Sequence, residues 1–198
     1  MATRSENTRI NRKRAFSIRM IESAFISLLK EMPCSKITVT DICDRADINR
    51  STFYSNFEDM NALVEHIQMS AVNKFNEIAK KHHEMSEFEI YRSHLQVILD
   101  MGIEDVVYNM PSFSSTYAYN KIMYDHIVVP RLGEAKDKDL LIEAFWYSRA
   151  GAQQLFASWA RTGKKISVDE LARRIANLNN VCIEYAMTGR DYSSEKKR

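Results

Sequence analysis

Residues 37–57 read Ile-Thr-Val-Thr-Asp-Ile-Cys-Asp-Arg-Ala-Asp-Ile-Asn-Arg-Ser-Thr-Phe-Tyr-Ser-Asn-Phe and are the most informative part of the chain. Apolar residues recur at helical spacing in the first half, and Thr38 is placed to cap a short helix there. Asp47, Ile48 and Asn49 form a polar turn, after which Asn49 can cap a second short helix that begins at Arg50. This pattern predicts a helix-turn-helix unit, whose second helix has the size to enter the major groove of DNA.

The second of these helices needs one buried side and one side that faces the bases. Phe53 is the predicted anchor. Arg can fork onto guanine, Ser or Thr can bond a base edge, and a Tyr hydroxyl can reach a phosphate. Hydroxyls and backbone N–H groups at the start of the first helix can also bind phosphate. The predicted DNA contacts are Arg12, Lys13, Arg14, Thr38, Thr40, Arg50, Ser51, Thr52, Tyr54 and Asn56.

The charge distribution favours the same partner. The whole chain of 198 residues has a net charge of only +2. Residues 1–57 carry ten basic and six acidic residues, a net of +4, so the remaining residues 58–198 sum to −2. A basic head on a slightly acidic body is typical of a DNA-binding module joined to a body that does not bind DNA. A solvated charged surface is the plainer alternative.

The stretch Ile37–Leu63, reading ITVTDICDRADINRSTFYSNFEDMNAL, closely resembles the tetracycline-repressor (TetR) family of bacterial transcription regulators. The resemblance is specific over roughly residues 10–70. Further on it rests on the number of helices and on the spacing of Gly151, Leu155, Phe156 and Trp159. It implies a homodimer, usually a repressor, that leaves its double-stranded operator DNA when a small molecule enters the C-terminal domain.

Three residues depart from the family pattern. Asp47 stands where the family usually has a turn glycine, and Asp tolerates the left-handed backbone better than most residues. Met60 stands where a Lys commonly touches phosphate, and Asn56 replaces a frequent His. These changes bear on the affinity for DNA and leave the predicted binding in place.

The composition predicts an all-α fold of about nine helices. Only 5 Gly and 3 Pro accompany 45% hydrophobic residues, which disfavours sandwiches, barrels and disorder. Apolar spacing and capping residues predict helices that start near Arg12, Val39, Arg50, Glu58, Ser86, Phe113, Lys138 and Ser167, with a short segment between Gly102 and Pro111. We expect a helix-turn-helix domain at residues 10–70 and a ligand-binding and dimerisation domain at residues 71–198.

Aromatic residues are dense in residues 108–159 and suggest a pocket for a small apolar or aromatic effector. Pockets between helices are largely apolar with a few polar tips, which Tyr and Trp supply. Ordinary core packing is the alternative for any one of them. The candidates are Tyr108, Phe113, Tyr117, Tyr124, Trp146, Tyr147, Phe156 and Trp159, with Tyr119 and Phe145 nearby.

The last helix carries an apolar stripe with heptad-like steps, namely Leu171, Ile175, Leu178, Cys182 and Tyr185. Such a stripe suits a dimer seam, and burial within one subunit is an equal alternative. A dimer has a separate justification, because two recognition helices one DNA turn apart double the length of the site.

Other chemistries find little support. Three Cys residues without metal-type spacing favour a reduced, cytoplasmic protein, and Cys43 is expected to be a buried packing residue. His82, His83 and His94 are expected at solvated positions, so no metal and no cofactor is predicted. No apolar run is long enough for a membrane span. Phosphate loops, nucleophile elbows and paired catalytic carboxylates are missing, so we expect no enzyme activity.

Two functions remain open at this point. The first is a dimeric transcriptional regulator, with repression favoured over activation. The alternative is a helical ligand- or partner-binding protein whose DNA-binding head is vestigial. Binding to DNA that weakens steeply with salt would separate them, because phosphate contacts release counterions.

Overall fold

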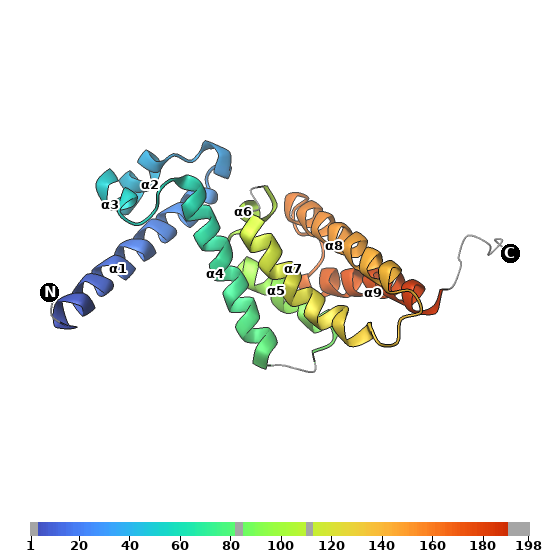
Figure 1. The fold of residues 1–198 in the computed structure, drawn as a ribbon. Coiled ribbons are helices and arrows are strands. Elements are labelled where there is room, and N and C mark those ends of the chain that lie inside the picture. The colour runs from blue at the N-terminus through green and yellow to red at the C-terminus, as the bar shows by residue number, and fades with distance from the viewer. Residues whose placement is uncertain (1–3, 82–84, 110–112, 190–198) are drawn as a thin grey trace. The chain divides into compact units, whose positions relative to one another are not determined.

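The computed structural model describes residues 4–81, 85–109 and 113–189. Within them the chain is all-α, as predicted, and forms nine α-helices with two short 3-10 turns (Figure 1). The helices are α1 (Arg4–Leu29), α2 (Val39–Ala46), α3 (Arg50–Tyr54), α4 (Met60–Lys81), α5 (Glu87–Met101), α6 (Glu104–Asn109), α7 (Phe113–Ile127), α8 (Lys138–Arg161) and α9 (Val168–Thr188). The 3-10 turns are η1 (Cys34–Lys36) and η2 (Val129–Arg131).

The chain divides into two compact units, which we describe separately. Unit 1 comprises residues 1–70 and 105–112, and unit 2 comprises residues 71–104 and 113–198. The segment 105–112 belongs to unit 1 although the chain reaches it through unit 2. Two hydrogen bonds hold it there: the Cys34 backbone N–H donates to Asp105 Oδ2 at 3.0 Å, and Gln68 Nε2 donates to the Val106 carbonyl at 3.1 Å.

One predicted helix start was wrong, and another differs by two residues. The first helix begins at Arg4 instead of near Arg12, because the prediction followed an apolar stripe that starts only at Ile18, whereas polar residues extend the helix by two further turns. The fourth begins at Met60 instead of Glu58. Asp59 caps it, with its carboxylate accepting from the Ala62 N–H at 2.8 Å.

The core of unit 1 joins α1 to the two short helices and the start of α4. Its fully buried side chains are Ile21, Phe25, Ile42, Phe53, Leu63 and Ile67. Cys43 is buried as predicted, and burial raises the pKa of its thiol. The Asp47 backbone adopts the left-handed conformation (φ 51°, ψ 51°) at the end of α2. The turn therefore forms without a glycine, in agreement with the expectation for Asp.

Unit 2 is a bundle in which α9 packs against both α5 and α8. Ser86 and Glu89 form a complete capping box at the start of α5. Ser167 caps α9 by accepting from the Glu170 N–H, and the Glu170 carboxylate pairs with Arg173 and Arg174. No helix among the described residues is long and apolar enough to cross a membrane.

Candidate functional site

Helix α3 presents a polar face and hides one aromatic anchor. Phe53 is completely buried, whereas Arg50, Ser51, Tyr54 and Ser55 are exposed. The rings of Phe53 and Phe57 lie 5.9 Å apart between centroids, and Tyr54 meets the Phe53 ring edge-on at 5.5 Å. The aromatic packing on the buried side of α3 thus fixes the orientation of its exposed side chains.

Arg50 and Tyr54 lie one turn apart on this face. A hydrogen bond with Tyr54 raises the pKa of Arg50 further above its already high value. The pairing restricts the guanidinium, which reduces the conformational entropy that it has left to lose on binding. Arg50 therefore offers an exposed, permanently charged guanidinium on this face.

Two of the predicted contact residues, Thr52 and Asn56, are not fully exposed on α3. Asn56 Nδ2 donates to the Thr52 carbonyl at 2.7 Å, so its amide closes the end of α3. Thr52 is half-buried and lines a groove between α1 and the helix-turn-helix, together with Lys13, Phe16, Asp47 and Asn49. The exposed residues of this segment are consequently Arg50, Ser51 and Tyr54 of α3 and Ser55 directly after it, and the Ser55 hydroxyl also donates to the Thr52 carbonyl, at 2.8 Å.

Thr38 is engaged within the protein. Its hydroxyl donates to Asp41 Oδ2 at 2.6 Å and accepts from the Asp41 N–H, and its own N–H donates to the same carboxylate at 2.8 Å. A phosphate at this position would have to compete with the Asp41 charge. Thr40 is exposed and leaves its side chain accessible.

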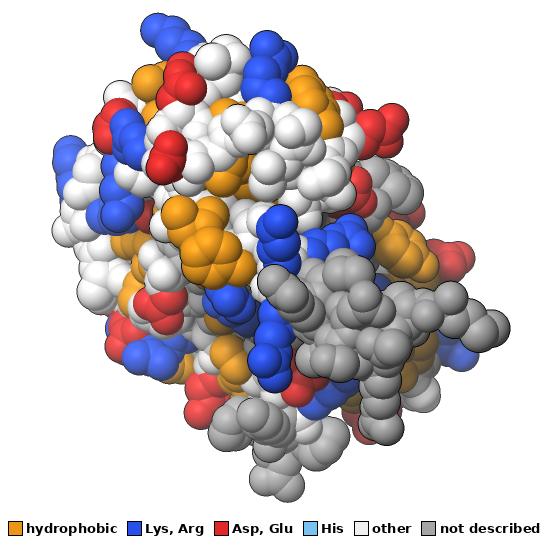
Figure 2. Space-filling model, turned by 90° about the vertical axis from the view of Figure 1, so that its left-hand side faces the viewer, with side chains coloured by type: hydrophobic (Ala, Val, Ile, Leu, Met, Phe, Trp, Pro, Cys, Tyr) orange, Lys and Arg blue, Asp and Glu red, His pale blue; other side chains and the backbone are white. Residues whose placement is uncertain are grey.

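Arg12, Lys13 and Arg14 are all exposed on α1. Figure 2 views the molecule from the side of α1, α2 and α3, and shows Lys and Arg side chains through the middle of this face, with Asp and Glu also present. A positive potential of this kind attracts DNA without reading its sequence.

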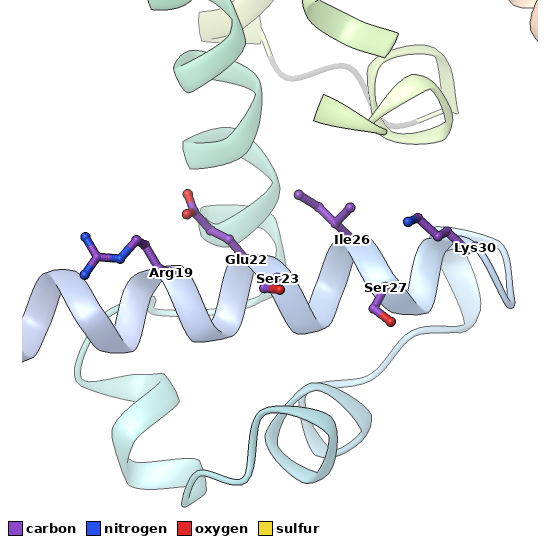
Figure 3. A pocket seen from close by; sticks show the side chains of 6 residues that line it. All are labelled: Arg19, Glu22, Ser23, Ile26, Ser27 and Lys30. Atoms are coloured by element: carbon purple, nitrogen blue, oxygen red, sulfur yellow. The ribbon is translucent and has the colours of Figure 1, made fainter. Parts of the chain in front are cut away.

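A second surface hollow lies along α1 and is lined by Arg19, Glu22, Ser23, Ile26, Ser27 and Lys30 (Figure 3). Five of the six residues belong to α1, and Lys30 directly follows its last residue. Glu22 is also paired with His66 of α4 at 3.1 Å. A hollow with a single helix as its wall cannot enclose a small molecule, so it is a poor effector site.

The predicted effector residues do not form one cluster. Tyr117, Trp146 and Tyr147 are exposed by 63%, 51% and 76%, whereas Phe156 and Trp159 are buried. Tyr124 is half-buried and meets the ring of Phe145 at 5.5 Å. The side chains of Tyr108 and Phe113 lie outside the described residues.

A different group of side chains converges inside unit 2. We call it the Arg149 cluster: Tyr91 and His94 of α5, Tyr119 and Asn120 of α7, Arg149 of α8 and Asn179 of α9. Sequence patterns indicate no role for Arg149 or Asn179, and His94 is expected in solvent. That expectation was wrong, because His94 Nδ1 is buried and the ring stacks on Tyr119 at 3.7 Å. His82 and His83 lie outside the described residues.

Helix α9 divides its predicted stripe between two faces. Leu171 and Ile175 are buried, Cys182 is half-buried, and Leu178 and Tyr185 are exposed together with Val181. Only the second half of the stripe is therefore accessible to another chain. Val181 was not in the predicted set, although it continues the exposed face one turn from Leu178.

Comparison with known structures identifies the fold as that of TetR-type transcriptional regulators. A TetR transcriptional regulator from Streptococcus agalactiae 2603V matches with a TM-score of 0.60 and 22% identity, over 87% of this chain and 98% of that chain. The fatty acid degradation regulator FadR from Bacillus halodurans matches with a TM-score of 0.56 and 12% identity, over 82% of this chain and 94% of that chain. No protein-family model and no curated protein matches the sequence.

Proposed function

We propose that this protein is a dimeric DNA-binding transcriptional regulator, and that it represses transcription until a small-molecule effector releases it from its operator. The geometry of α3 is the main observation that supports DNA binding. Its buried Phe53, its left-handed entry turn at Asp47 and its exposed Arg50, Ser51 and Tyr54 together make a short helix that offers polar groups outward. This is the arrangement that reading a major groove requires.

Dimerisation is supported by an apolar surface on the two last helices. Tyr147 and Leu155 are exposed on α8, and Leu178, Val181 and Tyr185 are exposed on α9. Leu178, Val181 and Tyr185 follow steps of three and four residues, and Tyr147 and Leu155 lie eight residues apart, so the residues of each helix share a face. Exposed apolar patches of this kind mark interaction sites, and α8 packs directly against α9. The proposed partner is a second copy of the chain, because two recognition helices are needed for a site of useful length.

Gly151 adds an independent argument for this seam. It lies in the middle of α8, one turn from both Tyr147 and Leu155, where glycine costs about 0.5–1 kcal/mol relative to alanine. A Cβ at this position would meet nothing within 4 Å in its own chain. Packing within the protomer therefore gives no reason for glycine, whereas a partner helix that approaches closely at this point does.

Effector-dependent release is supported by the buried polar groups of unit 2. A regulator needs two sites and two states that both ligands bias. The outer face of α3 supplies the first candidate site and the Arg149 cluster offers the second. Whether the protein represses or activates transcription depends on where the operator lies relative to the promoter. A reporter gene controlled by the selected operator tests whether the protein represses.

The test of DNA binding is selection of duplexes from a random-sequence library with the full chain, followed by anisotropy titrations of the selected duplex in a salt series. We expect a palindromic sequence and an affinity that falls steeply as salt rises, since each neutralised phosphate contributes a slope of about −0.9. Failure to enrich any duplex, or binding that salt does not change, would favour the helical ligand-binding protein with a vestigial head.

A further inference from the structure

Four helices of unit 2, namely α5, α7, α8 and α9, bring polar groups to one place. The Arg149 guanidinium carbon lies 4.7 Å from the centre of the Tyr119 ring and 5.7 Å from that of Tyr91. Arg149 Nε donates to Asn120 Oδ1 at 3.3 Å, and Arg149 Nη1 donates to the Tyr91 hydroxyl at 3.5 Å. Both distances are long for hydrogen bonds of this type. Phe75 of α4 covers the other side, with its ring 5.4 Å from Tyr119.

Two buried polar atoms of the cluster have no hydrogen-bond partner among the residues that the structure describes. They are the Tyr119 hydroxyl and His94 Nδ1. Tyr119 is only 8% exposed, so bulk water does not serve its hydroxyl. Buried polar side-chain atoms are satisfied in the large majority of cases, and each exception calls for an explanation such as an absent ligand or water.

The Tyr91 hydroxyl adds a third donor. It accepts from Asn179 Nδ2 and from Arg149 Nη1, which directs its own proton away from both of these partners. Tyr91, His94 and Tyr119 thus surround the same guanidinium with groups that can each give a hydrogen bond.

The charge of the cluster is positive. Burial, and then the Arg149 charge, hold the pKa of His94 well below its usual value, so the imidazole is neutral at pH 7. Burial raises the pKa of Tyr119 despite the opposing Arg149 charge, so the phenol keeps its proton. The acid that acts on Tyr91 is Glu87, which is itself paired with Arg131 at 3.0 Å. The guanidinium therefore sets the sign of the local field.

We propose that the Arg149 cluster binds the carboxylate of a small organic acid, and that this acid is the effector of the regulator. A planar guanidinium matches a carboxylate through two parallel N–H···O bonds. One positive charge among neutral donors balances a single negative charge better than the double charge of a phosphate. The rings of Phe75, His94 and Tyr119 offer an apolar surface to the body of the acid.

The effector role depends on the proposed function, whereas carboxylate binding does not. The two are measured apart, with binding of the acid followed by calorimetry in the absence of DNA. The probes are benzoate and octanoate, a flat and a linear acid, each compared with its primary amide. The amides keep the size and lose the charge. We expect at least one acid to bind the full-length protein at least tenfold more tightly than its amide.

Variants then assign the binding to the cluster. Arg149→Met should weaken binding of the acid at least tenfold and bring it to the level of the amide. Tyr119→Phe removes only one buried hydroxyl and keeps the ring, so it should fold normally and weaken binding several-fold. It also keeps the test decisive if Arg149→Met does not fold. Arg161→Met, an exposed residue of the same helix, is the matched control and should bind as the wild type does.

Several outcomes would overturn the proposal. These are equal binding of acids and amides, no binding of either acid, unchanged binding in both cluster variants, or tighter binding of inorganic phosphate than of either acid. If an acid binds through Arg149 but does not release the selected duplex, the site stands and its effector role fails. If no duplex is bound at all, the proposed function fails while the carboxylate site is still judged on calorimetry alone.

Discussion

The guanidinium of Arg45 on α2 makes a two-pronged contact with the carboxylate of Glu31, which follows the end of α1. Nη1 and Nη2 donate to Oε1 and Oε2 at 2.9 and 2.8 Å, and Nη1 also donates to Ser27 Oγ at 2.8 Å. The pair fastens the first helix of the helix-turn-helix to α1. Both side chains are partly exposed, so solvent screens the interaction.

This pair leads to a prediction about pH. The hydrogen bond from Arg45 lowers the pKa of Glu31. A lowered folded-state pKa means that the stabilisation is complete above the unfolded value of about 4.3 and is lost as the pH falls through the folded value. Glu31→Gln should therefore lower the melting temperature slightly at neutral pH, and the difference from wild type should vanish in acid. Glu134→Gln, at an exposed turn residue, is the control for a general effect of charge. A difference that grows in acid would contradict the assignment.

Asp47 leads to a prediction about the turn. Its left-handed backbone costs an ordinary residue roughly 1–2 kcal/mol, and its negative charge lies unfavourably at the C-terminal end of α2. Asp47→Gly should raise the free energy of unfolding and also tighten DNA binding by removing an acid. Asp47→Val should destabilise by about 1–2 kcal/mol, since a β-branched residue avoids this conformation. Urea unfolding measures the free energy of unfolding of both variants. Equal stability of Asp47→Gly and Asp47→Val would show that the turn relaxes to another backbone conformation.

Arg50 leads to a prediction about DNA. On the proposed function, Arg50→Ala should weaken binding to the selected duplex by about 1–3 kcal/mol, the range for an Arg that contacts a base. If Arg50 reads a guanine, discrimination at that base pair should relax. If it contacts only phosphate, all sequences should weaken alike and the salt slope should fall by about one. Anisotropy titrations with duplexes mutated at single base pairs distinguish the two results.

Asn56→Ala is the matched comparison for Arg50→Ala. Because the Asn56 amide donates to the Thr52 carbonyl, we expect a much smaller loss of DNA affinity. A loss as large as that of Arg50→Ala would indicate that Asn56 reorients and contacts DNA directly.

Gly151 leads to a prediction about assembly. Gly151→Leu places a large side chain between Tyr147 and Leu155 on the proposed seam, so the dimer should dissociate to monomers in sedimentation experiments. The protomer itself should keep its helical content and gain up to about 1 kcal/mol, because Leu favours a helix more than Gly does. Gly133→Leu, at a position where a Cβ also meets nothing within 4 Å, is the control and should leave the mass of the assembly in solution unchanged. A Gly151→Leu protein that remains dimeric would place the seam elsewhere.

Local sequence signals predicted unit 1 well. The periodicity of residues 37–57 and the capping power of Thr38 act over one or two turns, and both helices and the turn between them form as expected. The polar first turns of α1 were not predicted, because no apolar repeat marks them. The orientation of Asn56 could not be predicted for another reason. Its sequence neighbours do not indicate whether its amide turns outward or back to the Thr52 carbonyl.

By itself, the sequence determined the all-α architecture, the helix-turn-helix and the left-handed turn at Asp47, because each depends on residues a few positions apart. Tertiary structure alone decided which aromatic residues of unit 2 are buried and which face of α9 remains accessible. It also brought Tyr91, His94, Tyr119, Arg149 and Asn179 together from four helices. Helical periodicity states which residues share a face, but the packing of other helices determines whether that face meets the core or solvent.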